Sequence, residues 1–209
     1  NRQLVALTTL SDLVSEVRER VLADALEAGS ASSDRLEDGG VGAEAYADAV
    51  VTYLALCVSR TTDLSNALVT WSNGRDQARN LFARQAIPMA WDFVEINPFA
   101  RAAGDVGVAV DTTARALERL PAASFGVATQ ANAVERNYSS LAVSTDPPYY
   151  DNIGYSDLSD FFYVWLRRSL SSVQSKTVGT MLTPKAEELV ANPYRHDGRT
   201  GAEQFFVDG

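Results

Sequence analysis

Two consecutive prolines, Pro147 and Pro148, constrain the fold of this chain more than any other feature of its sequence. Each proline fixes its own φ angle and has no amide hydrogen, so the pair cannot lie inside a helix or a central strand. The mostly apolar run 141–144 comes directly before Thr145 and this turn. We therefore predict a strand over 141–145 that ends in a rigid turn.

A helix is expected soon after the turn. Between Ser156 and Leu170 apolar side chains recur at intervals of three and four residues, and either Ser156 or Asp157 can cap the first turn. A second short strand is expected over 124–129. Because open α/β sheets bind ligands in the loops at the ends of their strands, this order of strand, turn and helix predicts an α/β fold with its site at the turn.

The N-terminal part of the chain is expected to be helical. Apolar residues repeat with helical spacing over 10–26 and again over 46–57. The stretch 29–42 between them is rich in glycine and serine and predicts a flexible loop. We therefore divide the chain into a helical segment with this loop, residues 1–42, and a second domain, residues 43–209.

Local signals predict several shorter elements. The sequence Ser-Asn-Gly at 72–74 is typical of a turn, and residues 75–86 are expected to form a helix that ends before a proline. Asp111 can cap a helix over 112–120, and another short helix is expected over 184–191.

Charge and rare residues restrict the partners. The 209 residues include 18 Lys and Arg and 27 Asp and Glu, a net charge of −9, so the chain as a whole does not attract a polyanion. One cysteine, Cys57, and one histidine, His196, cannot make an internal disulfide or a zinc site, and Cys57 is expected to be a small buried hydrophobe. No apolar run is long enough to cross a membrane. A cytoplasmic setting fits, and the missing initial methionine suggests a piece of a longer protein.

The turn after the predicted strand could activate an aromatic amine, which is a poor nucleophile because its lone pair is delocalised into the ring. The Asp146 carboxylate would accept one amine hydrogen and the Pro147 carbonyl the other, which frees the lone pair for attack on a methyl sulfonium. Pro148 would fix the turn and Tyr149 would stack on the ring. Two further candidates lie at the lip of this substrate site, Tyr150 and Asn152.

The tetrad Asp146-Pro-Pro-Tyr149 resembles motif IV of the S-adenosylmethionine-dependent amino-methyltransferases, in the form common among adenine-specific DNA methyltransferases. Segments 145–162, 82–93 and 184–190 are similar to one large prokaryotic branch of that family, whose members often carry a zinc ribbon. The resemblance begins near Gly42 and implies a Rossmann-like methyltransferase sheet, here only in part. It also implies S-adenosylmethionine as cofactor and methyl transfer to the exocyclic amine of an adenine flipped out of DNA.

The chain departs from the family pattern at the cofactor. It has no glycine-rich turn of the Phe-x-Gly-x-Gly kind, because its dense glycine cluster at 39–42 follows no apolar strand. Asn132 stands where relatives often have the Asp of an Asp-Ala pair, and it is the candidate cofactor contact. A single cysteine excludes the zinc ribbon. We expect this chain by itself to hold the cofactor poorly and to be inactive.

Other functions remain compatible with the sequence. The same chemistry could act on RNA or on the amine of cytosine. The chain could also be a non-catalytic base-binding or scaffold subunit of a DNA modification system, or a structural helical domain in which the diproline turn is incidental. Its oligomeric state is left open.

Overall fold

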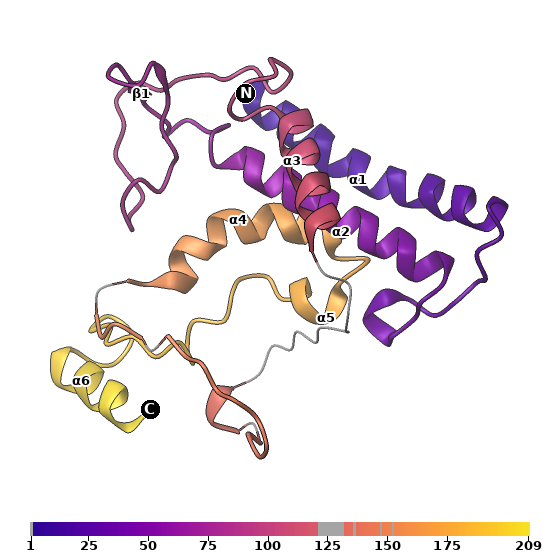
Figure 1. The fold of residues 1–209 in the computed structure, drawn as a ribbon. Coiled ribbons are helices and arrows are strands. Elements are labelled where there is room, and N and C mark those ends of the chain that lie inside the picture. Colours follow the sequence, from indigo (N-terminus) through magenta and orange to yellow (C-terminus); the bar gives the residue numbers. More distant parts are fainter. Residues whose placement is uncertain (1, 121–131, 136, 147, 152) are drawn as a thin grey trace. The chain divides into compact units, whose positions relative to one another are not determined.

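A computed structural model of the chain describes residues 2–120, 132–135, 137–146, 148–151 and 153–209 (Figure 1). Contacts between residues divide the chain into two compact units. The first comprises Asn1–Leu120 and Leu158–Thr183, and the second comprises Pro121–Asp157 and Pro184–Gly209.

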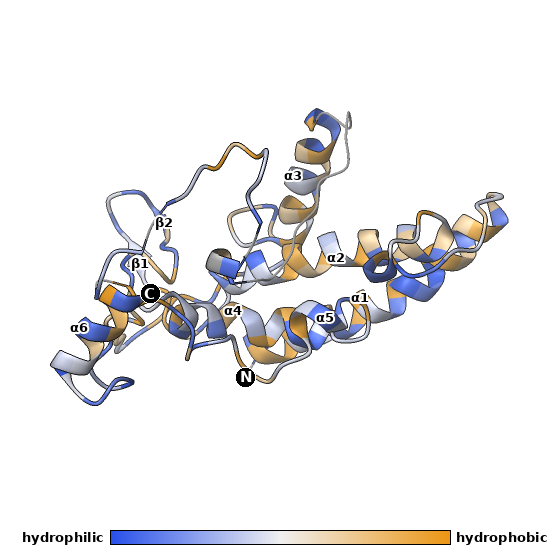
Figure 2. Cartoon of the chain, turned by 90° about the horizontal axis from the view of Figure 1, so that it is seen from below, coloured by the Kyte–Doolittle hydropathy of each residue, from blue (hydrophilic) through white to orange (hydrophobic). Residues whose placement is uncertain are grey.

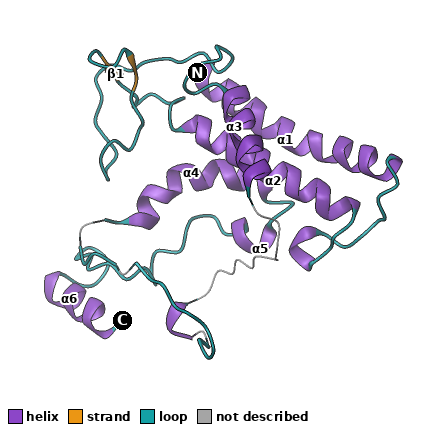
Figure 3. Cartoon of the chain, in the orientation of Figure 1, coloured by secondary structure: helices purple, strands orange, loops and turns teal. Residues whose placement is uncertain are grey.

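The expected α/β fold with a partial Rossmann-like sheet is wrong for the described part of the chain. Figure 3 shows helices joined by long loops, and the sheet found there is one antiparallel pair, β1 (Trp71–Ser72) with β2 (Gln77–Ala78). A Rossmann-like fold needs several parallel strands joined by crossover helices. These two-residue strands pair in the opposite sense and cannot form such a sheet.

The strand predicted over 141–145 is also wrong. The segment has no regular structure, and the side chains of Leu141 and Val143 are 52% and 56% exposed. A strand is stable only when a neighbouring strand pairs with its backbone, and no strand of the described residues lies beside this one. The other predicted strand, over 124–129, lies outside the described residues.

Two long helices, α1 (Arg2–Glu27) and α2 (Ala43–Thr62), lie side by side in the first unit, as the sequence predicted (Figure 1). Figure 2 shows apolar residues interleaved with polar ones along both helices, as amphipathic packing requires. The loop between them contains a short helix, η1 (Leu36–Asp38). The core of this unit gathers buried side chains from four segments: Val14, Val51, Ala55, Val58, Leu170, Val173 and Val178. Cys57 is buried as expected.

A buried carboxylate joins both helices to the loop between them. The side chain of Asp48 is fully buried, and its oxygens accept hydrogen bonds from Arg18 Nε at 2.7 Å, Arg35 Nε at 2.6 Å and the Leu36 amide at 3.1 Å. Burial by itself would raise the pKa of Asp48. The hydrogen bonds from Arg35, Arg18 and Leu36 outweigh burial and hold the pKa of this carboxyl below its ordinary value.

The turn predicted at 72–74 is confirmed, since it lies in the hairpin of β1 and β2, but the helix predicted over 75–86 is wrong. The Arg79 amide donates to the Thr70 carbonyl at 2.9 Å. The Leu81 amide donates to Asp63, at the end of α2. Backbone partners that lie earlier in the chain therefore determine the structure of this segment and outweigh its local helical propensity.

The remaining helices of the first unit differ in how well they were predicted. Helix α3 (Val106–Arg119) begins before the expected residue 112, because Asp105 and not Asp111 caps it, with Asp105 Oδ1 accepting from the Val108 amide at 3.0 Å. Helix α4 (Tyr155–Leu170) agrees with its prediction, and α5 (Ser175–Val178) was not predicted. No helix in the described ranges is both long and apolar enough to cross a membrane.

Among its described residues, the second unit contains little regular structure besides α6 (Arg199–Asp208), the short helix η2 (Ala133–Glu135) and the start of α4. The helix predicted over 184–191 is wrong: this segment is irregular, and the Ala191 amide donates to the Tyr150 carbonyl at 3.0 Å. A backbone partner 41 residues away thus replaces the local hydrogen bond that a helix would require.

Candidate functional site

The Asp-Pro-Pro-Tyr turn lies on the wall of a hollow of about 330 Å³ in the second unit. The described residues that line this hollow, here called the turn hollow, come from the turn itself, from the start of α4 and from the irregular segment after residue 184: Asp146, Pro148, Tyr155, Glu188, Leu189 and Val190. Two carboxylates and one phenol therefore share the space with three apolar side chains. Pro147 and Asn152 lie outside the described residues.

The Asp146 carboxylate is exposed and oriented by a neighbour in the same turn. Tyr149 donates its phenol hydrogen to Asp146 Oδ1 at an O–O distance of 2.7 Å. This hydrogen bond, together with the negative charge of Asp146, raises the pKa of the Tyr149 phenol. No described residue donates a hydrogen bond to Asp146 Oδ2. Since an ionised carboxylate has about four acceptor positions, Asp146 can still accept a hydrogen from a ligand.

The second carboxylate of the turn hollow, Glu188, accepts hydrogen bonds from the first turn of α4. Glu188 Oε1 accepts from the Ser156 amide at 2.8 Å, and Oε2 accepts from the Ser156 hydroxyl. The prediction that Ser156 or Asp157 caps α4 is therefore wrong, because α4 begins at Tyr155 and a carboxylate 32 residues away satisfies its first turn. A negative charge at this place also interacts favourably with the helix dipole.

Arg195 fixes Glu188 from the other side. Its Nη1 donates to Glu188 Oε2 at 3.1 Å and to the Lys185 carbonyl at 3.2 Å, and its Nη2 is paired with Asp157. Burial would raise the pKa of Glu188, but the hydrogen bonds from Ser156 and Arg195 outweigh it and hold this pKa below the ordinary value. The wall of the turn hollow that carries Glu188 is thus built from charge-assisted hydrogen bonds.

Sequence reasoning missed Tyr155, Glu188 and Arg195 as parts of the site. Segment 184–190 was singled out as a resemblance and as part of a short helix, and no motif pointed to Arg195. Because both segments are far from Asp146 in the chain, no local pattern could have placed them beside it.

Tyr150 fixes the turn and does not line the turn hollow. Its φ of +62° is unusual for a bulky residue, and three contacts hold it there. The carbonyl accepts from Ala191, the ring packs edge-on against Phe206 with centroids 5.1 Å apart, and the phenol interacts with Glu203. The lip role predicted for Tyr150 stays a prediction.

The candidate cofactor contact, Asn132, is exposed, and its carbonyl accepts from the Glu135 amide at 3.3 Å. It is not among the described residues that line the turn hollow. The role predicted for Asn132 stays a prediction.

The glycine cluster does not form a cradle for S-adenosylmethionine. A Cβ added to Gly40 would lie 1.8 Å from the Asp34 carbonyl oxygen, and one added to Gly42 would lie 2.3 Å from the Ala31 carbonyl oxygen. These glycines allow the loop to fold back on its own backbone, so they leave no open backbone for a ligand. Gly40 and Gly42 therefore do not offer the open backbone that the methionine part of the cofactor would need, and the cofactor stays a prediction.

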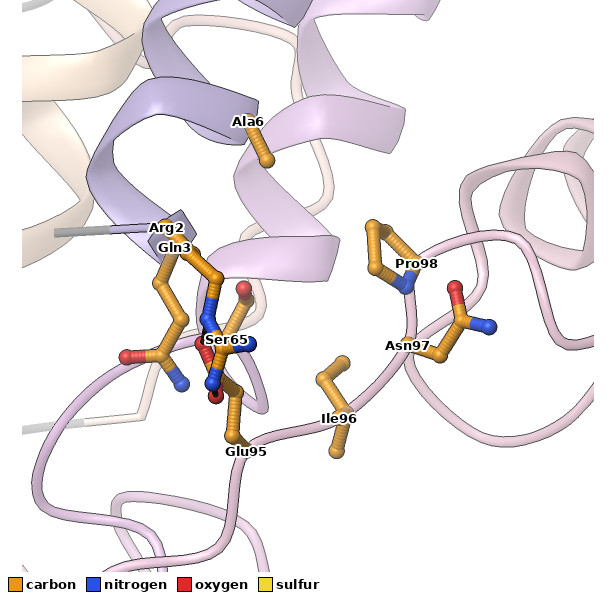
Figure 4. Close-up of a pocket in the computed structure, with 8 residues that line it drawn as sticks. All are labelled: Arg2, Gln3, Ala6, Ser65, Glu95, Ile96, Asn97 and Pro98. Carbon is orange, nitrogen blue, oxygen red and sulfur yellow. Dashed lines mark hydrogen bonds and ion pairs between the residues drawn. The ribbon is translucent and has the colours of Figure 1, made fainter.

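A different hollow, of about 340 Å³, lies in the first unit between the start of α1 and residues 95–98 (Figure 4). Arg2 and Glu95 form an ion pair there, with Arg2 Nε donating to Glu95 Oε1 at 3.2 Å. Gln3 Nε2 donates to the Asn66 carbonyl at 3.4 Å. Because its charged groups neutralise each other, this hollow is a weaker candidate than the turn hollow.

Comparison with known proteins identifies no relative. The chain matches no protein-family model, and neither a curated protein nor a solved structure is significantly similar to it.

Proposed function

We propose that this chain provides the amine-binding pocket of an enzyme that transfers a methyl group from S-adenosylmethionine to the exocyclic amine of adenine in DNA. One observation carries the proposal: the Asp146 carboxylate, with a free Oδ2 among the described contacts, lies on the wall of a hollow with aromatic and apolar sides. At about 330 Å³ this hollow falls within the range of small-molecule sites, roughly 300–1,000 Å³.

The chemistry follows from the hydrogen-bonding capacity of the turn. An exocyclic amine has two hydrogens, and the Asp146 carboxylate can accept one of them at Oδ2. As the nitrogen donates more strongly, its lone pair becomes less delocalised into the ring and more nucleophilic. An ionised acceptor gives a stronger hydrogen bond than a neutral one, and the effect is larger where a bound base excludes water. The Pro147 carbonyl is proposed to accept the second hydrogen.

The walls of the turn hollow favour a flat, neutral ligand that donates hydrogen bonds. Pro148, Leu189 and Val190 present apolar surface, and Tyr155 presents an aromatic ring. No described Lys or Arg lines the turn hollow, and Arg195 is engaged with Glu188 and Asp157. A phosphate would therefore find no cationic partner among these residues, whereas an amino-substituted heterocycle would match them.

A second candidate function is a base-binding subunit that does not catalyse methyl transfer. Gly40 and Gly42 are compatible with it, because their backbone lies against carbonyls of the same loop and so offers no open approach to a cofactor. RNA or the amine of cytosine could replace DNA adenine without a change in the chemistry. A net charge of −9 means that contact with any nucleic acid would depend on a local surface. We also propose a cytoplasmic location, which the single buried cysteine supports.

Methyl transfer to unmethylated DNA tests this proposal. The full-length protein that contains this chain is incubated with labelled S-adenosylmethionine and DNA, RNA or cytosine-only oligonucleotides, and its Asp146→Ala variant is compared with Asp151→Asn. Asp151 is an exposed carboxylate of the same turn that does not line the turn hollow, so its variant is the matched control. We expect Asp146→Ala to lose on the order of 100-fold in rate and Asp151→Asn to keep it.

Equal activity of Asp146→Ala and the wild type would contradict the proposed mechanism. Binding of adenine-containing DNA without methyl transfer, lost in Asp146→Ala, would establish the base-binding function instead.

A further inference from the structure

We propose that two tyrosines divide the recognition of the base: Tyr155 provides the ring on which it stacks, and Tyr149 orients the Asp146 carboxylate that accepts its amine hydrogen. This inference rests on the proposed function and assigns residues within the same site. It departs from the sequence-based expectation that Tyr149 is the stacking residue.

Tyr149 is engaged with the carboxylate. Its hydroxyl donates to Asp146 Oδ1 at 2.7 Å, and its side chain is not among those that line the turn hollow. A hydrogen bond from a residue three positions later restricts rotation of the Asp146 carboxylate and leaves Oδ2 as the oxygen to which no described residue donates. Tyr149 is therefore a positioning residue, which acts on the amine through Asp146.

Tyr155 has the placement that a stacking residue needs. It lines the turn hollow together with Asp146, and 48% of its surface is exposed, so its ring can receive a ligand. It is the first residue of α4, and the next residue, Ser156, is bonded to Glu188 through both its amide and its hydroxyl. The backbone that carries the Tyr155 ring is thus fixed before a ligand binds, which lowers the entropy lost on binding.

The two roles make different predictions about the exocyclic amine. A stacking ring contacts every base through its π-face, so its loss weakens binding whether or not the base has an amine. An orienting hydroxyl acts only where the amine meets Asp146, so its loss weakens binding only when the amine is present. The ratio of affinities for bases with and without the amine therefore separates the two roles.

The experiment measures fluorescence anisotropy of two labelled single-stranded DNA oligonucleotides, one of adenine and one with purine, which lacks the amine, in its place. We expect Tyr155→Ala to weaken binding of both oligonucleotides roughly 5- to 150-fold and Tyr155→Phe to leave both unchanged. We expect Tyr149→Phe to weaken binding of the adenine oligonucleotide alone, by roughly 2- to 10-fold. Tyr194→Ala is the control, because Tyr194 is a nearly fully exposed tyrosine of the same unit.

Three results would overturn the inference: no effect of Tyr149→Phe, no effect of Tyr155→Ala, or a loss in Tyr149→Ala that is equal for both oligonucleotides. Circular dichroism of each variant reports whether it is folded, and Tyr155→Leu, which removes the ring but keeps an apolar side chain, replaces the alanine variant if that one is not folded. Failure of the proposed function gives a different result, because the wild type would then show no preference for the amine and Asp146→Ala would bind like the wild type.

Discussion

Replacement of Asp48 by alanine should destabilise the first unit strongly. The Asp48 side chain is fully buried and accepts three hydrogen bonds, two from guanidinium groups and one from the Leu36 amide. The variant removes this acceptor but leaves Arg18 and Arg35 in place, and their side chains are 19% and 34% exposed. The cost in unfolding free energy is therefore that of two partly desolvated guanidinium groups that lose their shared carboxylate, of which Arg35 keeps a hydrogen bond to the Ser172 carbonyl.

Removal of one partner from a buried ion pair costs about 3–5 kcal/mol. We expect Asp48→Ala to lie near the lower end, at about 3 kcal/mol, because Arg18 and Arg35 retain enough exposure to be partly rehydrated. For a chain of this size that loss corresponds to a fall in Tm of roughly 6–12 °C. Asp12→Ala is the matched control. Its partner is Arg168, and the two side chains are 56% and 46% exposed, so its loss should cost less than about 1 kcal/mol.

Urea unfolding followed by tryptophan fluorescence measures this difference. All three tryptophans, Trp71, Trp91 and Trp165, lie in the first unit, so their emission reports on the part of the chain that contains Asp48. An Asp48→Ala variant that loses no more stability than Asp12→Ala would refute the reasoning. It would show that the hydrogen bonds from Arg18, Arg35 and Leu36 to Asp48 contribute little to the stability of the folded chain.

Three further perturbations have expected outcomes. The pKa of Glu188 is lowered from 4.5 in the folded chain, so its stabilising contribution is complete above that value and lost as pH falls below it. The stability difference between wild type and Glu188→Gln in urea should therefore shrink below about pH 4.5, and a difference that grows would refute this. Arg195→Ala should destabilise α4 by about 2–4 kcal/mol in thermal unfolding, whereas the exposed Arg199→Ala should cost under about 0.5 kcal/mol. Gly42→Ala should cost at least about 1 kcal/mol because its Cβ would meet a backbone carbonyl, while Gly74→Ala meets nothing and should be close to neutral; equal costs would contradict this.

The helices that could be predicted are those whose signal is local. Apolar spacing over 10–26, 46–57 and 156–170 identified α1, α2 and α4, because each presents one apolar stripe to the core. The start of α3 was missed because Gly107 interrupts the helical pattern immediately after Asp105, and Asp111 offered a second plausible cap. Caps can be placed from sequence only when a single candidate precedes the apolar stripe.

The fold class was mispredicted from a short apolar run. Residues 141–145 have the composition of a strand, but a strand exists only where a partner supplies the other half of the hydrogen bonds, and no local pattern shows that partner. The residues of the candidate site were likewise predictable only where they are close in sequence. Asp146 and Tyr149 were found because they belong to one turn. Glu188 and Arg195 were not, because they reach the site through contacts across 32 or more residues.

The amine hydrogen bond to Asp146 can be observed directly with adenine whose exocyclic nitrogen is labelled with ¹⁵N, in a single-stranded oligonucleotide bound to the protein. Proton NMR should show one of the two amine protons shifted downfield on binding to the wild type. The shift should be absent with Asp146→Asn, whose amide can present an N–H group where Oδ2 stood. Two unshifted amine protons with the wild type, or the same downfield shift with Asp146→Asn, would contradict the assignment of Asp146 as the acceptor.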